Sequence, residues 1–370
     1  MNNKQPILVV AGEPSGDQAA ARVIRAIQGA RPGIRFFGLG GAALEAAGVE
    51  LVEHISNLSV MGVAASIRAA GPVAQCWVRL RQAIAANRPA VALLIDSPEL
   101  NLPLARILRS NGIRVVYYIC PQVWAWRKGR LALLRNRVDQ AALILPFEKT
   151  LYDHAGVPSQ FVGHPIIDEP APNRAVLSRL KSELRIGEEP VIALLPGSRP
   201  SEWRHHGPAM ISAAQQLTAK NVRAFIAPLG IGTRRKIPAG QRLPNRFSAR
   251  ELLAIADGAI VASGTATLEA AVLGVPLAVV YRTDPLTYFA GRRLLKLPYV
   301  ALPNWIGGEK VVRELIQSEV NADSVAEAAL ELLAPDERQR QKAVLDKTKR
   351  ALGPPGAASR VAALVLERLV

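Results

Sequence analysis

Cysteines, aromatic residues and metal-binding motifs are scarce in this chain of 370 residues. Two cysteines, Cys76 and Cys120, are too few for a disulfide-stabilised fold and predict a protein of a reducing compartment, the cytoplasm. Aromatic residues make up 5% of the chain, which argues against a nucleic-acid partner, because such surfaces interleave aromatic and basic groups. No Asp-x-Asp motif occurs, and Glu202 and His206 lack a third ligand, so we expect no metal and no cofactor.

Long apolar runs are also missing. The longest uncharged stretches, such as 54–67 and 270–281, fall short of the 18 or so apolar residues that a membrane-spanning helix needs. Hydrophobic residues nevertheless make up 49% of the chain, which is enough to fill a large core. Because a chain of this length exceeds what one core accommodates, we expect two domains.

Acidic residues are the minority charge, and the formal net charge is +16. Such a balance predicts an anionic partner. The segment 54–95 has no acidic residue at all, and its arginines lie among apolar residues. This composition is typical of a surface that touches anionic lipid. The expected lipid contacts are Arg68, Trp77, Arg79 and Arg81. Two ordinary amphipathic helices that cover a sheet would have the same composition.

Short apolar runs alternate with helical patterns along most of the chain. Because the runs are apolar on both faces and each is followed by a turn and a helix, they predict parallel strands in βαβ units. The fold class is therefore α/β. The expected strands are Ile7–Ala11, Ile34–Gly38, Val91–Ile95, Val115–Ile119, Ala142–Leu145, Val191–Leu195, Arg223–Ala227, Ala259–Ala262 and Leu277–Tyr281.

A proline-rich segment divides this series in two. Residues 163–173 read GHPIIDEPAPN, and a new strand–turn–helix series begins at Val191. We expect two Rossmann-like domains, 1–165 and 166–345, facing across a cleft that is lined by the loops at the carboxyl ends of their strands. Residues 346–370 predict a helical segment that packs back on the first domain or on a partner subunit of a homodimer.

The first strand runs into AGEPSGD, residues 11–17. A helix that starts here offers free backbone N–H groups to an anion or a polar ligand, with Ser15 or Asp17 as its cap. The motif departs from G-x-G-x-x-G, so it does not predict a dinucleotide. A plain tight turn at Gly12 and Gly16 is the alternative.

Asp96 follows the strand 91–95 and is the first catalytic candidate. A carboxylate at the carboxyl end of a buried strand, held by a Ser-Pro turn, suits a general base. Capping the next helix is the common alternative role of an aspartate in this position. After the following strand, CPQVWAWR at 120–127 opens a basic run to Arg137, which suits a phosphorylated amphiphile or, alternatively, forms one solvated helix face.

Two strand ends in the second half combine anion donors with a diol acceptor. Backbone N–H groups at helix starts, hydroxyls and one guanidinium together suit a diphosphate. These donors belong to Gly197, Ser198, Arg199, Ser263, Gly264 and Thr265. Glu269 lies one turn into its helix, where a carboxylate accepts hydrogen bonds from vicinal ribose hydroxyls. The pair of loops therefore predicts a nucleotide site, and we expect the nearby His205 and His206 to be exposed.

Over roughly residues 6–316, the order and spacing of these motifs resemble the lipid-A-disaccharide synthases. The matching motifs are AGEPSGD, VMG at 60–62, IDSPELN at 95–101, PQVWAWR, LPFE at 145–148, FVGHP at 161–165, LLPGSR, SGTATLE and LPN at 302–304. That family is similar to GT-B glycosyltransferases. The resemblance implies an inverting enzyme that joins UDP-2,3-diacylglucosamine to 2,3-diacylglucosamine 1-phosphate and releases UDP. It also implies a peripheral protein of the inner membrane, in Gram-negative lipid A synthesis.

The resemblance implies that Asp96 is the general base. It places Glu13, Ser15 and Asn101 in the acceptor side of the cleft. It places Arg199, Glu269 and Asn304 at the nucleotide. The chain departs from the family at Glu99-Leu100 and at Glu309-Lys310, and its segment 226–250 is shorter than expected. A UDP-sugar epimerase on the same fold and a non-catalytic UDP-sugar or lipid-binding protein are the alternative functions.

Overall fold

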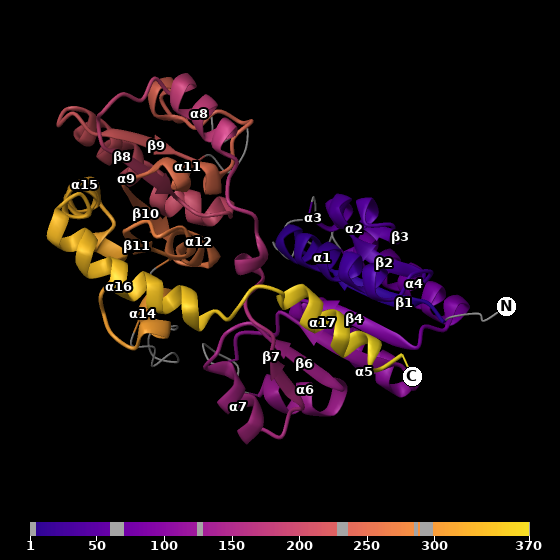
Figure 1. The fold of residues 1–370 in the computed structure, drawn as a ribbon. Helices are drawn as coiled ribbons and strands as arrows, with labels where there is room; N and C mark the ends of the chain where they lie inside the picture. Colours follow the sequence, from indigo (N-terminus) through magenta and orange to yellow (C-terminus); the bar gives the residue numbers. More distant parts are fainter. Residues whose placement is uncertain are drawn as a thin grey trace. The chain divides into compact units, whose positions relative to one another are not determined.

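The computed structural model describes residues 5–59, 70–123, 129–227, 236–284, 288 and 299–369. The chain divides into two compact units, the first made of Met1–Asp168 and Leu352–Val370 and the second of Glu169–Ala351. Each unit contains one parallel sheet with helices on both faces (Figure 1). The predicted α/β class with two parallel sheets and C-terminal helices is confirmed.

A seven-stranded parallel sheet forms the centre of the first unit. In spatial order its strands are β3 (Glu50–His54), β2 (Phe36–Gly40), β1 (Ile7–Ala11), β4 (Val91–Ile95), β5 (Arg114–Tyr118), β6 (Gln140–Leu143) and β7 (Ser159–Phe161). Ala11 of β1 lies opposite Ile95 of β4, which lies opposite Tyr118 of β5. The loops that follow β1, β4 and β5 therefore leave the sheet side by side.

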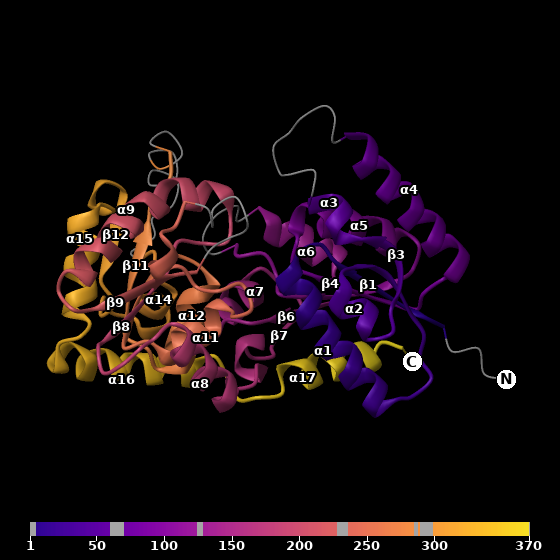
Figure 2. The ribbon, with the colours of Figure 1, turned by 90° about the horizontal axis from the view of Figure 1, so that it is seen from above.

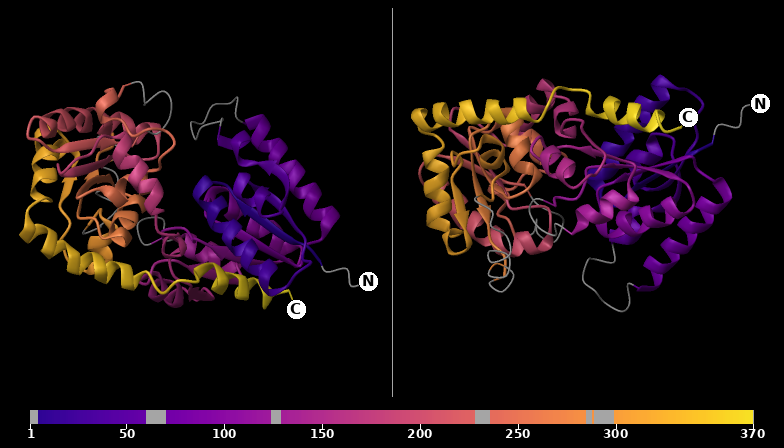
Figure 3. Two further views of the ribbon diagram at one scale, coloured as in Figure 1. Left: turned by 45° about the horizontal axis from the view of Figure 1, so that its top comes forward. Right: turned by 90° about the horizontal axis from the view of Figure 1, so that it is seen from below.

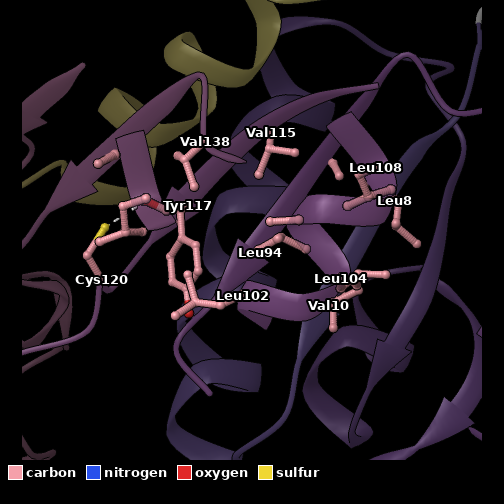
Figure 4. Packing of buried hydrophobic residues seen from close by; sticks show 14 of the residues in the cluster. Leu8, Val10, Leu94, Leu102, Leu104, Leu108, Val115, Tyr117, Cys120 and Val138 are labelled. Atoms are coloured by element: carbon pink, nitrogen blue, oxygen red, sulfur yellow. Dashed lines mark hydrogen bonds between the residues drawn. The ribbon is translucent and has the colours of Figure 1, made fainter. Parts of the chain in front are cut away.

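Helices cover both faces of this sheet. On one face α1 (Pro14–Ala30) and α17 (Ala357–Leu366) pack against each other. The other face carries α4 (Ala70–Asn87), α5 (Pro98–Ser110), α6 (Arg130–Arg137) and α7 (Glu148–His154). In this second core, strand residues such as Leu8, Val10 and Leu94 meet Leu102, Leu104 and Leu108 of α5 (Figure 4). Two short helices, α2 (Ala42–Ala46) and α3 (Ile55–Ser59), follow β2 and β3.

The second unit repeats this plan with a five-stranded parallel sheet. Its strands follow the order β12 (Glu314–Ile316), β11 (Leu277–Tyr281), β10 (Gly258–Ala262), β8 (Val191–Leu195) and β9 (Arg223–Ile226). One face packs on α9 (Pro200–Thr218) and α15 (Ala322–Glu331), and the other on α8 (Arg174–Glu183), α11 (Ala249–Ile255), α12 (Thr265–Leu273) and α16 (Pro335–Ala351) (Figure 2). The short helix α14 (Leu302–Gly307) follows the loop that leads from β11.

The nine predicted strands all exist, and the described residues contain three more that were not predicted. β1, β4, β8 and β11 have the predicted bounds, and the other five are shifted by one or two residues. The three unpredicted strands, β3 (ELVEH), β7 (SQF) and β12 (ELI), are all edge strands. An edge strand is partly solvated, so it lacks the two-sided apolar pattern that marks the central strands.

The C-terminal residues return to the first unit beside the end of β7. The Asp168 carboxylate accepts hydrogen bonds from the N–H groups of Gly356 and Ala358 at 2.6 and 3.1 Å, and so caps α17. The Arg360 guanidinium donates to the Val162 carbonyl at 2.8 Å. The apolar face of α17 is thereby buried within the first unit, where the helix packs on α1. Figure 3 shows α17 lying along this unit. The predicted boundary at 345 falls within α16, which belongs entirely to the second unit.

His164 lies in the same region and is buried. Its backbone N–H donates to the Leu352 carbonyl at 2.8 Å, and its Nδ1 accepts a hydrogen bond from the Ile166 N–H at 3.2 Å. Burial lowers the pKa of the imidazole to about 4. The ring is therefore neutral at pH 7, with its proton on Nε2.

We predict that His164 makes the protein sensitive to mild acid. Because the folded-state pKa is below that of the unfolded chain, the unfolded state binds more protons between about pH 6.5 and pH 4, and stability is lost as pH falls through this window. The loss amounts to about 3 kcal/mol. Urea denaturation of His164→Asn should show a shallower pH dependence than the parent in this window. The exposed-site control His154→Asn should keep the parent's slope, and equal slopes for all three proteins would contradict the assignment.

Candidate functional site

Asp96 lies at the carboxyl end of β4, where the chain takes an unusual backbone conformation. Asp96 and Ser97 have φ angles of 50° and 43°, in the left-handed region that non-glycine residues seldom adopt. The Asp96 carbonyl accepts two hydrogen bonds, at 2.8 Å from Asn101 Nδ2 and at 2.6 Å from the Tyr117 hydroxyl. Both donor residues are fully buried. The structure therefore holds the backbone of this residue firmly, at a cost of about 1–3 kcal/mol for each strained residue.

Asn101 was expected among the acceptor-side residues, and its side chain points inward instead. It is fully buried, and its amide donates to the carbonyls of Ile95 and Asp96 at 2.9 and 2.8 Å. Asn101 thus acts on the site through the Asp96 backbone. Tyr117 has the same role and was not singled out from the sequence, because a buried tyrosine within a strand looks like any core residue.

The start of α1 lies beside Asp96. A Cβ atom added to Gly12 would lie 2.5 Å from Ser97 Oγ, so only glycine allows the two loops to approach this closely. Glu13 is the N-cap residue of α1, but its side chain forms no capping hydrogen bond. Both Glu13 and Ser15 are exposed. The first N–H groups of the helix and two polar side chains are therefore available at the edge that carries Asp96.

Asp17 does not cap α1, contrary to one of the two expectations for this helix. It is buried, and its carboxylate accepts hydrogen bonds from the N–H groups of Gly41, Ala43 and Leu44 at 2.7, 2.9 and 3.2 Å. The side chain thereby caps α2, more than twenty residues away in the sequence. Local spacing cannot reveal such a contact, because it depends on how β1 and β2 pair.

In the loop after β8, two of the predicted anion donors form hydrogen bonds within the protein. The Glu202 carboxylate accepts hydrogen bonds from the backbone N–H groups of Ser198 and Arg199 at 2.6 and 3.0 Å. It packs so tightly that a Cβ atom on Gly197 would lie 2.2 Å from Glu202 Oε2. The Arg199 guanidinium remains exposed, 4.0 Å from Glu202 Oε1. The backbone N–H groups of Ser198 and Arg199 are thus engaged within the loop, whereas the Arg199 guanidinium is exposed and can reach a ligand.

His206 is buried, so the expectation that it is exposed was wrong. Its Nδ1 donates to the Pro196 carbonyl at 2.8 Å, and its Nε2 accepts a hydrogen bond from the Arg282 N–H at 3.0 Å. Burial lowers the pKa of the ring, in keeping with a neutral imidazole that bridges the ends of β8 and β11. The neighbouring His205 is half-buried, with its Nε2 3.8 Å from Asp284 Oδ1.

The start of α12 is the clearest anion-binding geometry in the second unit. Its N-cap residue, Gly264, has a φ of 150° and no side-chain cap, and Thr265 is exposed. The first N–H groups of a helix have no partner within it, so they are available to an anion here. The Ser263 hydroxyl donates to the Val300 carbonyl at 2.7 Å and so retains only its acceptor lone pairs for a ligand.

Glu269, one turn into α12, lies in a group of three charged side chains. Burial raises the pKa of its carboxyl, the charge of Glu169 adds to the increase, and Arg250 opposes it. Arg250 pairs with Glu169 at 3.4 Å, and its side chain is 15% exposed. Arg250 and Glu169 were not singled out from the sequence, because only the fold brings them next to Glu269.

Asn304 was expected with the nucleotide, and the structure places it in the interior. Its Oδ1 accepts hydrogen bonds from the N–H groups of Val311 and Val312, and its amide donates to the Val312 carbonyl and to Glu314 Oε1, all within 3.0 Å. The side chain is fully buried, with its oxygen and its amide both bonded within the protein. Asn304 therefore organises the loop that leads to β12.

The expected lipid contacts fall into several environments. Arg68 lies outside the described residues, and Trp77 packs partly against the core. Arg79 Nη1 lies 3.0 Å from Glu53 Oε2, so an acid from β3 neutralises an arginine of the segment that itself contains none. Arg81 is exposed on α4.

The basic run from Arg127 to Arg137 is described only from residue 129 onward. Arg130 Nη2 donates to both carboxylate oxygens of Glu99 at 2.8 and 2.6 Å, so one cation of this basic run is paired.

Within the described ranges, no group of three or more metal-binding side chains occurs. Nor does any described helix combine the length and apolar character that crossing a bilayer requires. Both cysteines are free and buried, and burial raises the pKa of Cys76 to about 11.

The fold is shared by solved enzymes of two kinds. A kitacinnamycin glycotransferase superimposes with a TM-score of 0.63 at 17% identity, covering 99% of both chains. A UDP-GlcNAc 2-epimerase from Neisseria meningitidis superimposes with a TM-score of 0.59 at 12% identity, covering 98% of this chain and 99% of the epimerase. At these identities the likeness shows the two-domain fold alone and does not separate transfer from epimerisation.

The sequence comparisons are more specific. A family model described as lipid-A-disaccharide synthetase matches residues 7–367. The lipid-A-disaccharide synthase of Myxococcus xanthus is 39% identical over 384 residues, which cover 100% of this chain and 99% of that relative. Matches that extend along the whole of both chains at this identity show that the protein belongs to the lipid-A-disaccharide synthase family of glycosyltransferases.

Proposed function

We propose that this chain joins UDP-2,3-diacylglucosamine to 2,3-diacylglucosamine 1-phosphate with inversion at the anomeric carbon, and that Asp96 is the general base. Asp96 takes the proton of the acceptor's 6-hydroxyl while that oxygen attacks the anomeric carbon. The bond between this carbon and the diphosphate oxygen breaks, and UDP leaves. The observation that carries the proposal is the fixed position of Asp96 at the carboxyl end of β4.

A general base is effective when it is held in the orientation that proton transfer needs. The two buried donors on the Asp96 carbonyl, Asn101 and Tyr117, supply this restraint. They also offset the strain of the left-handed backbone, which would otherwise relax and turn the carboxylate away. Glu13 and Ser15, exposed at the start of α1, complete the polar edge that receives the acceptor sugar.

The leaving UDP is bound by the second unit. The uncapped start of α12 and the Arg199 guanidinium stabilise the negative charge that develops on the diphosphate. Glu269 accepts the ribose hydroxyls, and these hydrogen bonds compensate the carboxylate for its burial. The Ser198 backbone N–H and the Asn304 side chain act indirectly, since both are engaged within the protein.

A UDP-sugar epimerase is the alternative that the fold alone allows. An epimerase converts UDP-GlcNAc without an acceptor, whereas a transferase requires one and releases UDP. A non-catalytic binding protein would bind UDP-sugar without releasing UDP. Incubation with UDP-GlcNAc alone, and with both lipid substrates, separates the three functions.

We also propose that the protein is cytoplasmic and attaches peripherally to the inner membrane. The support is its net charge of +16 and the outer face of α4, where Val78, 53% exposed, lies beside Arg79 and Arg81. Apolar groups enter the interface while guanidinium groups meet the headgroups. Val78 thus takes the apolar role that the sequence assigned to Trp77.

Asp96→Asn should lower turnover by about 10²–10⁴-fold, because an amide cannot accept the proton. The melting temperature should stay close to that of the parent, since the restraining hydrogen bonds are made by the Asp96 backbone. Coupled UDP release with both lipid substrates measures the effect. The exposed carboxylate variant Asp153→Asn is the control and should retain full turnover. Near-normal turnover in a folded Asp96→Asn protein would remove Asp96 from the base role.

Arg199→Ala and Glu269→Ala should each weaken UDP binding by about 1–3 kcal/mol, or about 5- to 150-fold in Kd. Removing Glu269 should not lower the melting temperature, because burial already disfavours its charged form. Calorimetric titration with UDP measures both effects. The control is Arg204→Ala, because Arg204 is exposed on α9, the helix whose N-cap residue is Arg199. Unchanged affinity in both variants would place the nucleotide elsewhere.

Binding to anionic vesicles should fall with salt but not vanish, since salt screens the arginines and not the apolar contact. Replacing Arg68, Arg79 and Arg81 together by Glu should weaken the binding further, while the UDP affinity in solution stays the same. Val78→Ser should reduce the part that survives high salt. Co-sedimentation with vesicles measures these effects. A triple variant that binds as well as the parent would show that these arginines are ordinary solvated helix residues.

A further inference from the structure

Arg250 is a largely buried cation of the second unit that the proposed reaction does not use. It is the second residue of α11, and α11 packs against α12, the helix that carries Glu269 (Figure 1). The Arg250 side chain is 15% exposed, less than the 26% of Glu169, with which it pairs at 3.4 Å. Its Nε and Nη1 atoms are fully enclosed, and neither forms a hydrogen bond within the described part of the chain. The ion pair with Glu169 therefore compensates the guanidinium charge only in part.

Neither a simple ion pair nor a helix end explains this burial. Removing a guanidinium from water can cost more free energy than pairing it with a partly solvated carboxylate returns. A helix dipole does not favour the cation either, because Arg250 lies in the first turn of α11, where the dipole is positive. The charge of Arg250 also acts on Glu269, so this second carboxylate supplies further compensation.

Two charged neighbours act on Glu269, in opposite directions. Burial raises the pKa of the Glu269 carboxyl, the charge of Glu169 raises it further, and Arg250 lowers it. The other acid of α11, Glu251, is bonded at the start of that helix. Of the strands and helices that pack on α12, α14 and β10 have no titratable side chain, and β11 has Tyr281, whose raised pKa keeps it neutral. The inward residues of α16 are uncharged: Gln341, Val344, Leu345 and Thr348.

The ionisation state of Glu269 decides how it meets a ribose. A carboxylate has two acceptor oxygens, so it accepts a hydrogen bond from each of two vicinal hydroxyls, whereas a protonated carboxyl turns one oxygen into a donor. Hydrogen bonds to the ionised form are also about twice as strong. A diphosphate bound at the start of α12, one turn before Glu269, adds negative charge and disfavours the ionised carboxyl. A bound nucleotide therefore increases the need for a cation beside Glu269.

We propose that Arg250 is a positioning residue of the nucleotide site, which keeps Glu269 ionised so that both carboxylate oxygens accept the ribose hydroxyls of the donor nucleotide. Glu169 has the opposite effect on the Glu269 charge, and its ion pair holds the guanidinium in place. This role rests on the proposed contact between Glu269 and the ribose, and Arg250 acts through that contact. An ion pair that only stabilised the fold would leave ribose recognition unchanged.

The test compares the binding of UDP and of 2′-deoxy-UDP, which lacks one of the two ribose hydroxyls. Calorimetric titration of the full chain, from acidic to mildly alkaline pH, gives the ratio of the two Kd values. The phosphate groups are common to both ligands, so the ratio isolates the hydroxyl, and a general loss of stability affects both ligands alike. In the parent we expect a ratio of about tenfold or more when Glu269 is ionised, falling as pH is lowered and Glu269 is protonated.

Arg250→Gln should move the midpoint of this pH profile upward, because the lost cation favours the ionised carboxylate. At the parent's midpoint its ratio should be several-fold lower. Glu169→Gln should move the midpoint downward, since the lost anion disfavours the ionised form. Arg250→Lys retains the charge and should stay closer to the parent than Arg250→Gln.

The matched control is Arg246→Gln, because Arg246 is another ion-paired arginine of the second unit, bonded to Glu183. It should leave the profile unchanged. Melting temperatures show whether Arg250→Gln is folded, and Glu169→Gln, which changes a more exposed residue, tests the same role independently.

Midpoints that coincide in the parent, Arg250→Gln and Glu169→Gln, or that move in the same direction in both variants, would overturn the role of Arg250 and leave Glu269 in the nucleotide site. A Kd ratio that is unchanged in Glu269→Gln would instead overturn the ribose contact of Glu269, and the role of Arg250 with it. The two failures are therefore distinguishable.

Discussion

When a strand is buried on both faces, polar and catalytic side chains can lie only at its ends. In both sheets the central strands are apolar throughout, and their backbone groups are satisfied by the neighbouring strands. Parallel pairing then gathers the loops that follow these strands at one edge, where helix starts add their free N–H groups. Asp96, the start of α1 and the start of α12 all owe their positions to this constraint.

Many polar residues in these loops hold other loops in place rather than meet a ligand. Asp17 caps a helix that follows the adjacent strand, Glu202 binds the N–H groups before α9, and Asn304 closes the turn before β12. Each of these contacts satisfies backbone N–H groups of a loop or a helix start, and each hydrogen bond contributes about 0.5–3 kcal/mol. Because these hydrogen bonds hold the loops in place, the exposed side chains that remain for a ligand, such as Glu13 and Arg199, extend from fixed backbone.

The two edges of the first sheet have different chemical characters. The carboxyl edge carries acidic and hydroxyl groups, whereas the amino edge carries arginines beside an apolar wall. Because five-residue strands separate the two edges, a ligand at one does not contact the other.

The sequence by itself determined the central strands, the division into two parallel-sheet units and the family, because these depend on apolar runs and on motifs that are local in the chain. The place of Asp96 at a strand end followed for the same reason. Only the tertiary structure decided that Asn101, His206 and Asn304 are buried and that Glu53 neutralises Arg79. It also gathered arginines from three separate segments, at Arg88, Arg114 and Arg368, at the amino edge of the first sheet. A side chain's partners depend on which strands pair and which helix faces meet, and neither is encoded in local spacing.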